Sequence, residues 1–139
     1  MKQEQPDVQG PSKDSVPRAL RAWFILHFWV DILFAIPLFV APRSFLGLLG
    51  WTIIDPFTTR IVAAALFGIG IQSLLGRDEP RSTFRAMLTL KVIWSTTATA
   101  GLIISGLEGG PLLAWGVAAF WAVFCAVWWH FWLRLRKNG

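Results

Sequence analysis

Four long apolar stretches constrain the fold of this chain more than any other feature of its sequence. They cover residues 20–41, 57–76, 84–106 and 111–133. Each is long enough to cross a bilayer, which takes about 20 apolar residues in a helix. Backbone polar groups in lipid must be satisfied within their own segment, so each stretch is expected to be helical. The sequence therefore predicts an all-α, polytopic integral membrane protein with a transmembrane domain over residues 20–133.

The composition supports this class and argues against a soluble enzyme. Hydrophobic residues make up 55% of the chain and charged residues 15%, whereas soluble domains carry about 25% charged residues. The sequence contains no hydrolase, kinase, dinucleotide-binding or zinc-protease motif. We leave enzymatic activity open, but the sequence favours a protein without it.

The distribution of basic residues predicts the orientation of the spans. Most of the 13 Lys and Arg residues flank the spans on one side, where cytoplasmic loops carry their positive charge. Short loops make successive helices antiparallel neighbours, so we expect an up-down-up-down bundle with both termini cytoplasmic. The basic residues assigned to that side are Lys2, Lys13, Arg18, Arg21, Arg77, Arg81, Arg85, Arg134, Arg136 and Lys137.

The two ends of the chain are predicted to be cytoplasmic tails. Residues 1–19 are polar and contain three prolines, which is typical of a disordered segment, and residues 134–139 form a short basic tail. The net charge of +5 follows from this cytoplasmic bias. We therefore expect contact with anionic lipid of the bilayer and no nucleic-acid partner.

Each span carries a face of small or polar residues that are four positions apart. Residues at this spacing lie on one side of a helix, and polar or small side chains favour the interior of a membrane bundle. We therefore expect the four faces to point at one another. They are Trp23, His27, Asp31 and Ala35; Arg60, Ala64, Gly68 and Gln72; Lys91, Ser95 and Thr99; and Ala114, Ala118, Ala122, Ala126 and His130.

The polar members of these faces predict one cluster in the cytoplasmic half of the bundle, since helices rise about 1.5 Å per residue. Asp31 and Lys91 form either a structural ion pair or a protonatable, ligand-binding site. Arg60 stands apart toward the outer side, where it would contact headgroups, pair with an acidic loop residue or bind a lipid phosphate. The candidates for a ligand or ion site are His27, Asp31, Gln72, Lys91, Ser95, Thr99 and His130.

The two histidines suggest a weaker alternative. His27 and His130 have similar predicted depths on spans that are neighbours in a closed bundle. Two imidazoles in that arrangement would suit a haem or another pigment, or a metal with Asp31. Interfacial histidines without a cofactor fit the same pattern, and no CxxCH motif is present. We therefore predict no cofactor and no metal site, and keep the haem interpretation open.

The first outer loop, residues 42–56, is too apolar to be solvated and too short to span. We expect a short helix or turn there, in the membrane interface. Asp55 is placed to cap the second span, with Pro56 at the first helical position.

One region resembles a known group of proteins. The pattern runs over residues 30–80 and consists of Ala41-Pro42, Leu46-Gly47-Leu48-Leu49-Gly50, Asp55-Pro56, Arg60, Gly68, Gly70 and Leu75-Gly76-Arg77. It is similar to uncharacterised small bacterial four-helix inner-membrane proteins. The resemblance implies the four-helix fold and a bacterial inner (cytoplasmic) membrane, and it implies no functional residue.

Three classes of function fit these observations. The first is a small non-enzymatic membrane protein, either an accessory or scaffold subunit of a membrane complex or a binder of a lipid-like or pigment-like ligand. The second is a homo-oligomeric transporter or channel for ions or small molecules, with a buried site at Asp31 and Lys91. The third is a membrane redox protein that ligates haem through His27 and His130.

Overall fold

The computed structural model describes residues 16–137, and all regular structure within this range is helical. Most of the predicted N-terminal tail, and the last two residues of the predicted C-terminal tail, lie outside the described residues. The elements are α1 (Arg18–Val40), α2 (Pro42–Leu48), α3 (Pro56–Leu75), the 3-10 helix η1 (Gly76–Asp78), α4 (Arg81–Leu107) and α5 (Leu112–Lys137).

Four of these helices are long and apolar enough to cross a membrane, as the sequence predicts. They are α1, α3 with η1, α4 and α5. The remaining helix, α2, lies in the predicted interfacial loop and has seven residues. The chain therefore has the architecture of a helical membrane protein.

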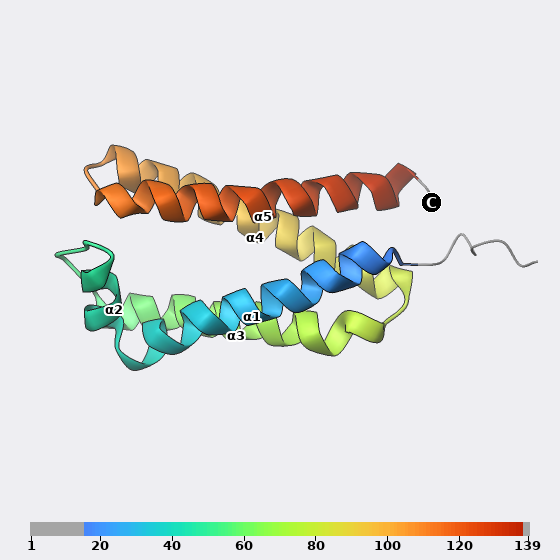
Figure 1. The fold of residues 1–139 in the computed structure, drawn as a ribbon, viewed down its shortest axis with the longest axis horizontal. Coiled ribbons are helices and arrows are strands. Elements are labelled where there is room, and N and C mark those ends of the chain that lie inside the picture. The colour runs from blue at the N-terminus through green and yellow to red at the C-terminus, as the bar shows by residue number, and fades with distance from the viewer. Residues whose placement is uncertain (1–15, 138–139) are drawn as a thin grey trace, which may run out of the picture.

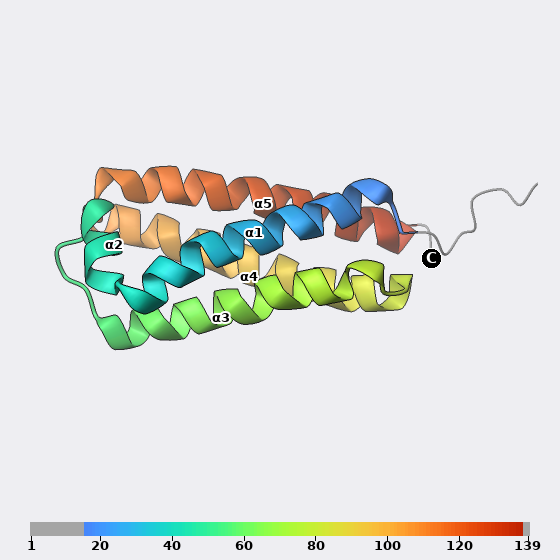
Figure 2. The same ribbon diagram turned by 60° about the horizontal axis from the view of Figure 1, so that its bottom comes forward.

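The long helices form two pairs. The closest backbone packing joins α1 to α3 and α4 to α5. Figures 1 and 2 place α2 at one end of the molecule, with the start of α1 and the end of α5 at the other. The two pairs converge at that other end, where α4 approaches α1 and α3, and they diverge toward α2 (Figure 1).

The buried side chains differ in size between these two ends of the molecule. Away from α2, the pairs meet through large rings, with Phe24 packed 4.8 Å from Phe84 and 5.5 Å from Trp128 between ring centroids. Toward α2, the buried side chains include the small Ala35 of α1 and Ala63 of α3. Small residues allow close approach of α1 and α3, and Phe34 of α1 packs across to Trp121 of α5, with ring centroids 5.3 Å apart.

The buried face of α5 differs from the predicted ladder of alanines. Ala114 and Ala118 are buried, but Ala122, Ala126 and His130 are exposed. A step of four residues overshoots one helical turn by about 40°, so a ladder with that spacing drifts around the helix. The buried residues instead combine steps of three and of four: Ala114, Ala118, Trp121, Phe124, Trp128, Phe131 and Leu135.

The prediction of which face of α3 points into the bundle is also wrong. Arg60, Ala64, Gly68 and Gln72 are all exposed. The buried face lies next to it on the helix, because a shift of one residue rotates a side chain by about 100°. It consists of Thr59, Ala63, Leu66, Gly70 and Ser73.

The start of α3 is capped as predicted. The Asp55 carboxylate accepts hydrogen bonds from the backbone N–H groups of Phe57 at 3.0 Å and Thr58 at 3.2 Å, and from the Thr58 hydroxyl. Pro56 occupies the first helical position. The hydrogen bond from the Thr58 hydroxyl, followed by those from the two amides, holds the pKa of Asp55 below its ordinary value of 3.8.

We predict that Asp55→Ala frays the first turn of α3, whereas Asp55→Asn, which also caps, preserves it. Because the folded-state pKa is lowered, the contribution of the cap is complete above pH 3.8 and is lost as the pH falls through the folded value. Hydrogen exchange of the Phe57 and Thr58 amides in detergent measures this. Equal exchange rates in both variants at neutral pH would contradict the assignment of Asp55 as the cap of α3.

Candidate functional site

Four buried polar side chains from three helices meet in the half of the molecule away from α2. His27 and Asp31 belong to α1, Ser73 to α3 and Lys91 to α4. Lys91 Nζ donates to Ser73 Oγ at 2.7 Å and lies 3.1 Å from His27 Nδ1. His27 Nδ1 lies 2.8 Å from Asp31 Oδ2. We refer to these four residues as the polar cluster.

His27 Nδ1 lies between a donor and an acceptor. It accepts a hydrogen bond from Lys91 when it is unprotonated, or donates one to Asp31 when it carries a proton. Apart from the contact with His27, neither Asp31 oxygen has a hydrogen-bond partner in the described part of the chain. The location of one proton therefore decides which contact of His27 is a hydrogen bond.

The local sequence explains how α1 and α3 reach this geometry. His27 and Asp31 are four residues apart, so they lie on one face of α1. Gly70 of α3 packs against Asp31: a Cβ at position 70 would lie 2.8 Å from the Asp31 Cβ. One turn further along α3, the Ser73 hydroxyl donates to Ile69 O at 2.6 Å, which leaves its oxygen free to accept from Lys91.

Aromatic rings surround the polar cluster. Lys91 Nζ lies 4.9 Å from the ring centroid of Phe24 and 5.0 Å from that of Trp128. The His27 ring packs edge-on against Phe124 and Trp128, with centroid distances of 5.0 and 5.1 Å. Ring faces attract cations, most strongly when water is excluded. The rings thus supply part of the solvation that Lys91 loses on burial.

A small niche adjoins Lys91 and Ser73. Its volume is about 10 Å³, which is near the lower limit for holding one water molecule. Gln72 borders the same niche but is exposed, and its Nε2 lies 3.8 Å from Met87 Sδ. Gln72 is therefore a neighbour of the polar cluster and makes no hydrogen bond to it.

The other predicted site residues have different surroundings. Ser95 is buried one turn beyond Lys91 and lies 3.4 Å from Val92 O. Thr99 Oγ1 is buried and has no hydrogen-bond partner among the described residues. Ser73, a central member of the polar cluster, is missed by the sequence analysis. The buried face of α3 could have been recognised from its small residues, which are Ala63, Gly70 and Ser73.

The structure does not bring the two histidines together. His27 is 3% exposed and engages Lys91 and Asp31, whereas His130 is exposed on α5 and its ring packs near Phe131 at 5.3 Å. Trp128, two residues before His130, takes the inward position that the haem interpretation requires of His130. Within residues 16–137, no three His, Cys, Asp or Glu side chains are grouped as metal ligands.

An apolar cleft of about 460 Å³ separates the two helix pairs near α2. Trp94 and Trp121 line it from α4 and α5, and Phe34 and Leu66 from α1 and α3. Hydroxyl side chains line it as well, and they come from the helix ends near α2. The lining hydroxyl residues are Thr58, Thr59 and Ser105.

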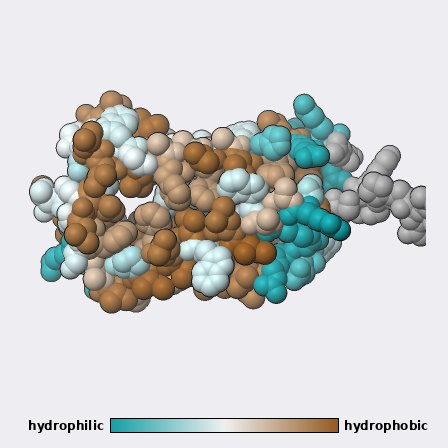
Figure 3. Space-filling view, viewed as in Figure 1, coloured by the Kyte–Doolittle hydropathy of each residue, from teal (hydrophilic) through white to brown (hydrophobic). Residues whose placement is uncertain are grey.

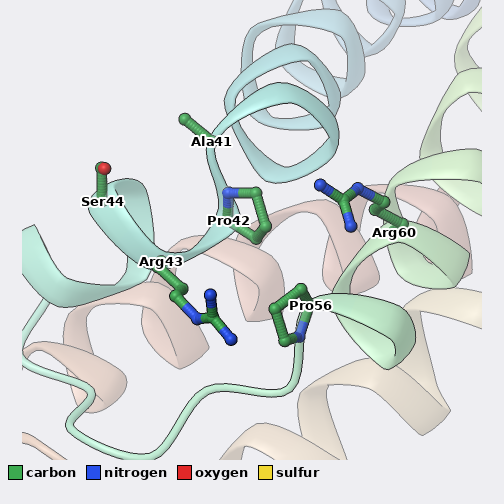
Figure 4. Close-up of a pocket in the computed structure, with 6 residues that line it drawn as sticks. All are labelled: Ala41, Pro42, Arg43, Ser44, Pro56 and Arg60. Carbon is green, nitrogen blue, oxygen red and sulfur yellow. The ribbon is translucent and has the colours of Figure 1, made fainter.

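Arg60 lies outside this cleft. Its Nε donates to Phe39 O, near the C-terminal end of α1, at 3.1 Å. This position agrees with the prediction that Arg60 stands apart from the polar cluster. It borders a second pocket, which is shown in Figure 4.

Comparisons of the chain with protein-family models, with curated proteins and with solved structures gave no match. The fold and the site therefore define only a class: a small helical membrane protein with a buried polar cluster and an apolar cleft.

We predict that Gly70→Ala destabilises the protein by about 1–3 kcal/mol, because the new methyl group forces α3 away from Asp31. Gly68→Ala is the matched control, since a Cβ there meets nothing within 4 Å and alanine favours helix by up to about 1 kcal/mol. Unfolding in detergent, followed by circular dichroism, compares the two. Equal stabilities would contradict the close packing of Gly70 on Asp31.

Proposed function

We propose that this protein is a small non-enzymatic membrane protein that binds a lipid-like or pigment-like ligand in the cleft between its two helix pairs. The cleft itself carries the proposal. Its volume of about 460 Å³ falls within the range of about 300–1,000 Å³ for small-molecule pockets. Its lining is mainly aromatic and aliphatic, which suits a hydrocarbon chain or ring system.

The proposal includes an orientation in the membrane. The four long helices cross a bacterial inner membrane in alternate directions, with both termini cytoplasmic and α2 at the outer face. The positive-inside rule supports this arrangement. Hydrophilic residues gather at the end opposite α2 (Figure 3), and Arg21, Arg77 and Arg81 belong to that end.

The polarity of the cleft indicates how a ligand would lie. Thr58 and Ser105 are near the helix ends at α2, whereas Trp94 and Trp121 lie deeper along the helices. An amphiphile would place its hydrocarbon part between the tryptophans and its polar group near α2. In a bilayer, the acyl chains of lipids are the most abundant groups able to fill such a space.

Filling the cleft tests this proposal. Ala98 of α4 lines the cleft, and Ala100 is exposed two residues further along the same helix. We expect Ala98→Phe to lower the ligand occupancy about tenfold, which corresponds to about 1.4 kcal/mol of binding free energy, and Ala100→Phe to leave it unchanged. Native mass spectrometry after extraction in a mild detergent measures the occupancy.

The alternatives give different results in that experiment. An adduct that persists equally in both variants would overturn binding in the cleft. A wild-type protein that carries no adduct but co-purifies with other membrane subunits would favour an accessory or scaffold role instead.

The polar cluster favours a second function, a homo-oligomeric transporter or channel that uses Asp31 and Lys91. The supporting observation is the alternative placement of one proton between Asp31, His27 and Lys91, beside a niche with room for about one water. Ionisable residues inside membrane spans commonly mark ion pathways or proton relays.

For this second function we predict that Asp31→Asn abolishes proton flux in proteoliposomes that contain a pH-sensitive dye. Asparagine keeps the shape of the side chain and removes its ability to take up a proton. Asp78→Asn, at an exposed position in η1, is the control and should retain the flux. Wild-type vesicles that are no leakier to protons than empty vesicles would contradict proton transport through the polar cluster.

A further inference from the structure

A pocket of about 400 Å³ lies at the α2 end, where α1 ends and α3 begins. Figure 4 shows the guanidinium groups of Arg43, from α2, and Arg60, from α3, extending toward the space beside Pro42 and Pro56. Among the described residues, none of those that line it is acidic. The lining residues are Ala41, Pro42, Arg43, Ser44, Pro56 and Arg60.

The two arginines are held in different ways. Arg60 Nε is fixed by its hydrogen bond to Phe39 O, and this leaves its terminal amino groups available. Arg43 is exposed and has no hydrogen bond or ion pair to any residue within 16–137. Two like charges that border one pocket repel each other, and an anion between them would remove this repulsion. Guanidinium groups bind phosphate oxygens strongly, often through two hydrogen bonds.

The surroundings of the pocket indicate the source of the anion. Val40 is 71% exposed, Phe57 73% and Ile61 55%, and these side chains lie at the adjoining ends of α1 and α3. In a membrane they would contact acyl chains, which places the arginines at the level of the headgroups. An anionic lipid would then contact the arginines through its phosphate and the apolar side chains through its chains.

We propose that Arg43 and Arg60 form a binding site for the phosphate group of an anionic lipid in the leaflet at the α2 end. The site is separate from the cleft, because α2 lies between them: Arg43 and Ser44 border the pocket, whereas Phe45 and Leu46 line the cleft. The inference requires that the helices span a membrane, and it does not require a ligand in the cleft.

The test uses the full chain in nanodiscs of phosphatidylcholine with increasing amounts of phosphatidylglycerol. We expect Arg43→Gln to lower the number of phosphatidylglycerol molecules retained, with an affinity loss of about tenfold. Arg43 makes no hydrogen bond within the described residues, so this change should leave the fold intact. Arg85→Gln, at an exposed basic position of α4 away from α2, is the matched control and should change the affinity less than twofold.

Arg60→Lys provides a second readout, since it keeps the positive charge but lacks the fork of donors that guanidinium offers. We expect a loss of affinity in this variant as well. Equal effects of Arg43→Gln and Arg85→Gln would overturn the site, because general attraction to anionic lipid would then explain the binding. If inorganic phosphate binds as tightly as phosphatidylglycerol and Arg43→Gln weakens both, the lipid assignment is overturned and the ligand is free phosphate.

The two binding proposals fail independently. Ala98→Phe changes the cleft and leaves the arginines in place, whereas Arg43→Gln changes the arginine pocket and leaves the cleft open. Loss of phosphatidylglycerol in Ala98→Phe, with none in Arg43→Gln, would place the lipid in the cleft and overturn the arginine site.

Discussion

The arrangement of the helices depends on the solvation of one amine, that of Lys91. An amine inside the hydrocarbon region of a bilayer must find partners in the protein, because none exist in the lipid. The partners of Lys91 in the other helix pair are His27 of α1 and Ser73 of α3. Within its own pair, α4 and α5, its partner is the ring of Trp128. These contacts fix where the two pairs meet.

The polar cluster and the cleft are two results of that one constraint. Where the pairs converge, aromatic rings fill the space around the amine and leave room for little more than a water molecule. Toward α2 the ring of Phe34 on α1 packs against Phe120 and Trp121 of α5, while the side chains of Ala35 and Ala63 are small. The tight packing of one half thus comes with an opening in the other, where the aromatic side chains line a space instead of filling it.

The number and placement of the helices could be predicted from the sequence, because a stretch of apolar residues long enough to span has few alternatives. The grouping of His27, Asp31 and Lys91 in one cluster was predictable from helical spacing and from the cost of isolated charges in lipid. The expected ion pair between Asp31 and Lys91 is absent among the described residues, because Lys91 contacts His27 and Ser73 instead. The role of Ser73 was not predictable, since Ser73 directly follows Gln72 and the packing of α3 on its neighbours decides which of the two side chains is buried. His130 was misplaced for a related reason. A ladder of residues with steps of four drifts around the helix, so His130 lies off the buried face of α5.

The order of the residues along the chain has a consequence for assembly. His27, Asp31 and Ser73 all precede Lys91 in the sequence, and α1 and α3 pack mainly on each other. Chains are synthesised from the N-terminus, so α1 and α3 are made before α4. Lys91 is therefore the last member of the polar cluster to be synthesised, after both of the cluster side chains that it contacts.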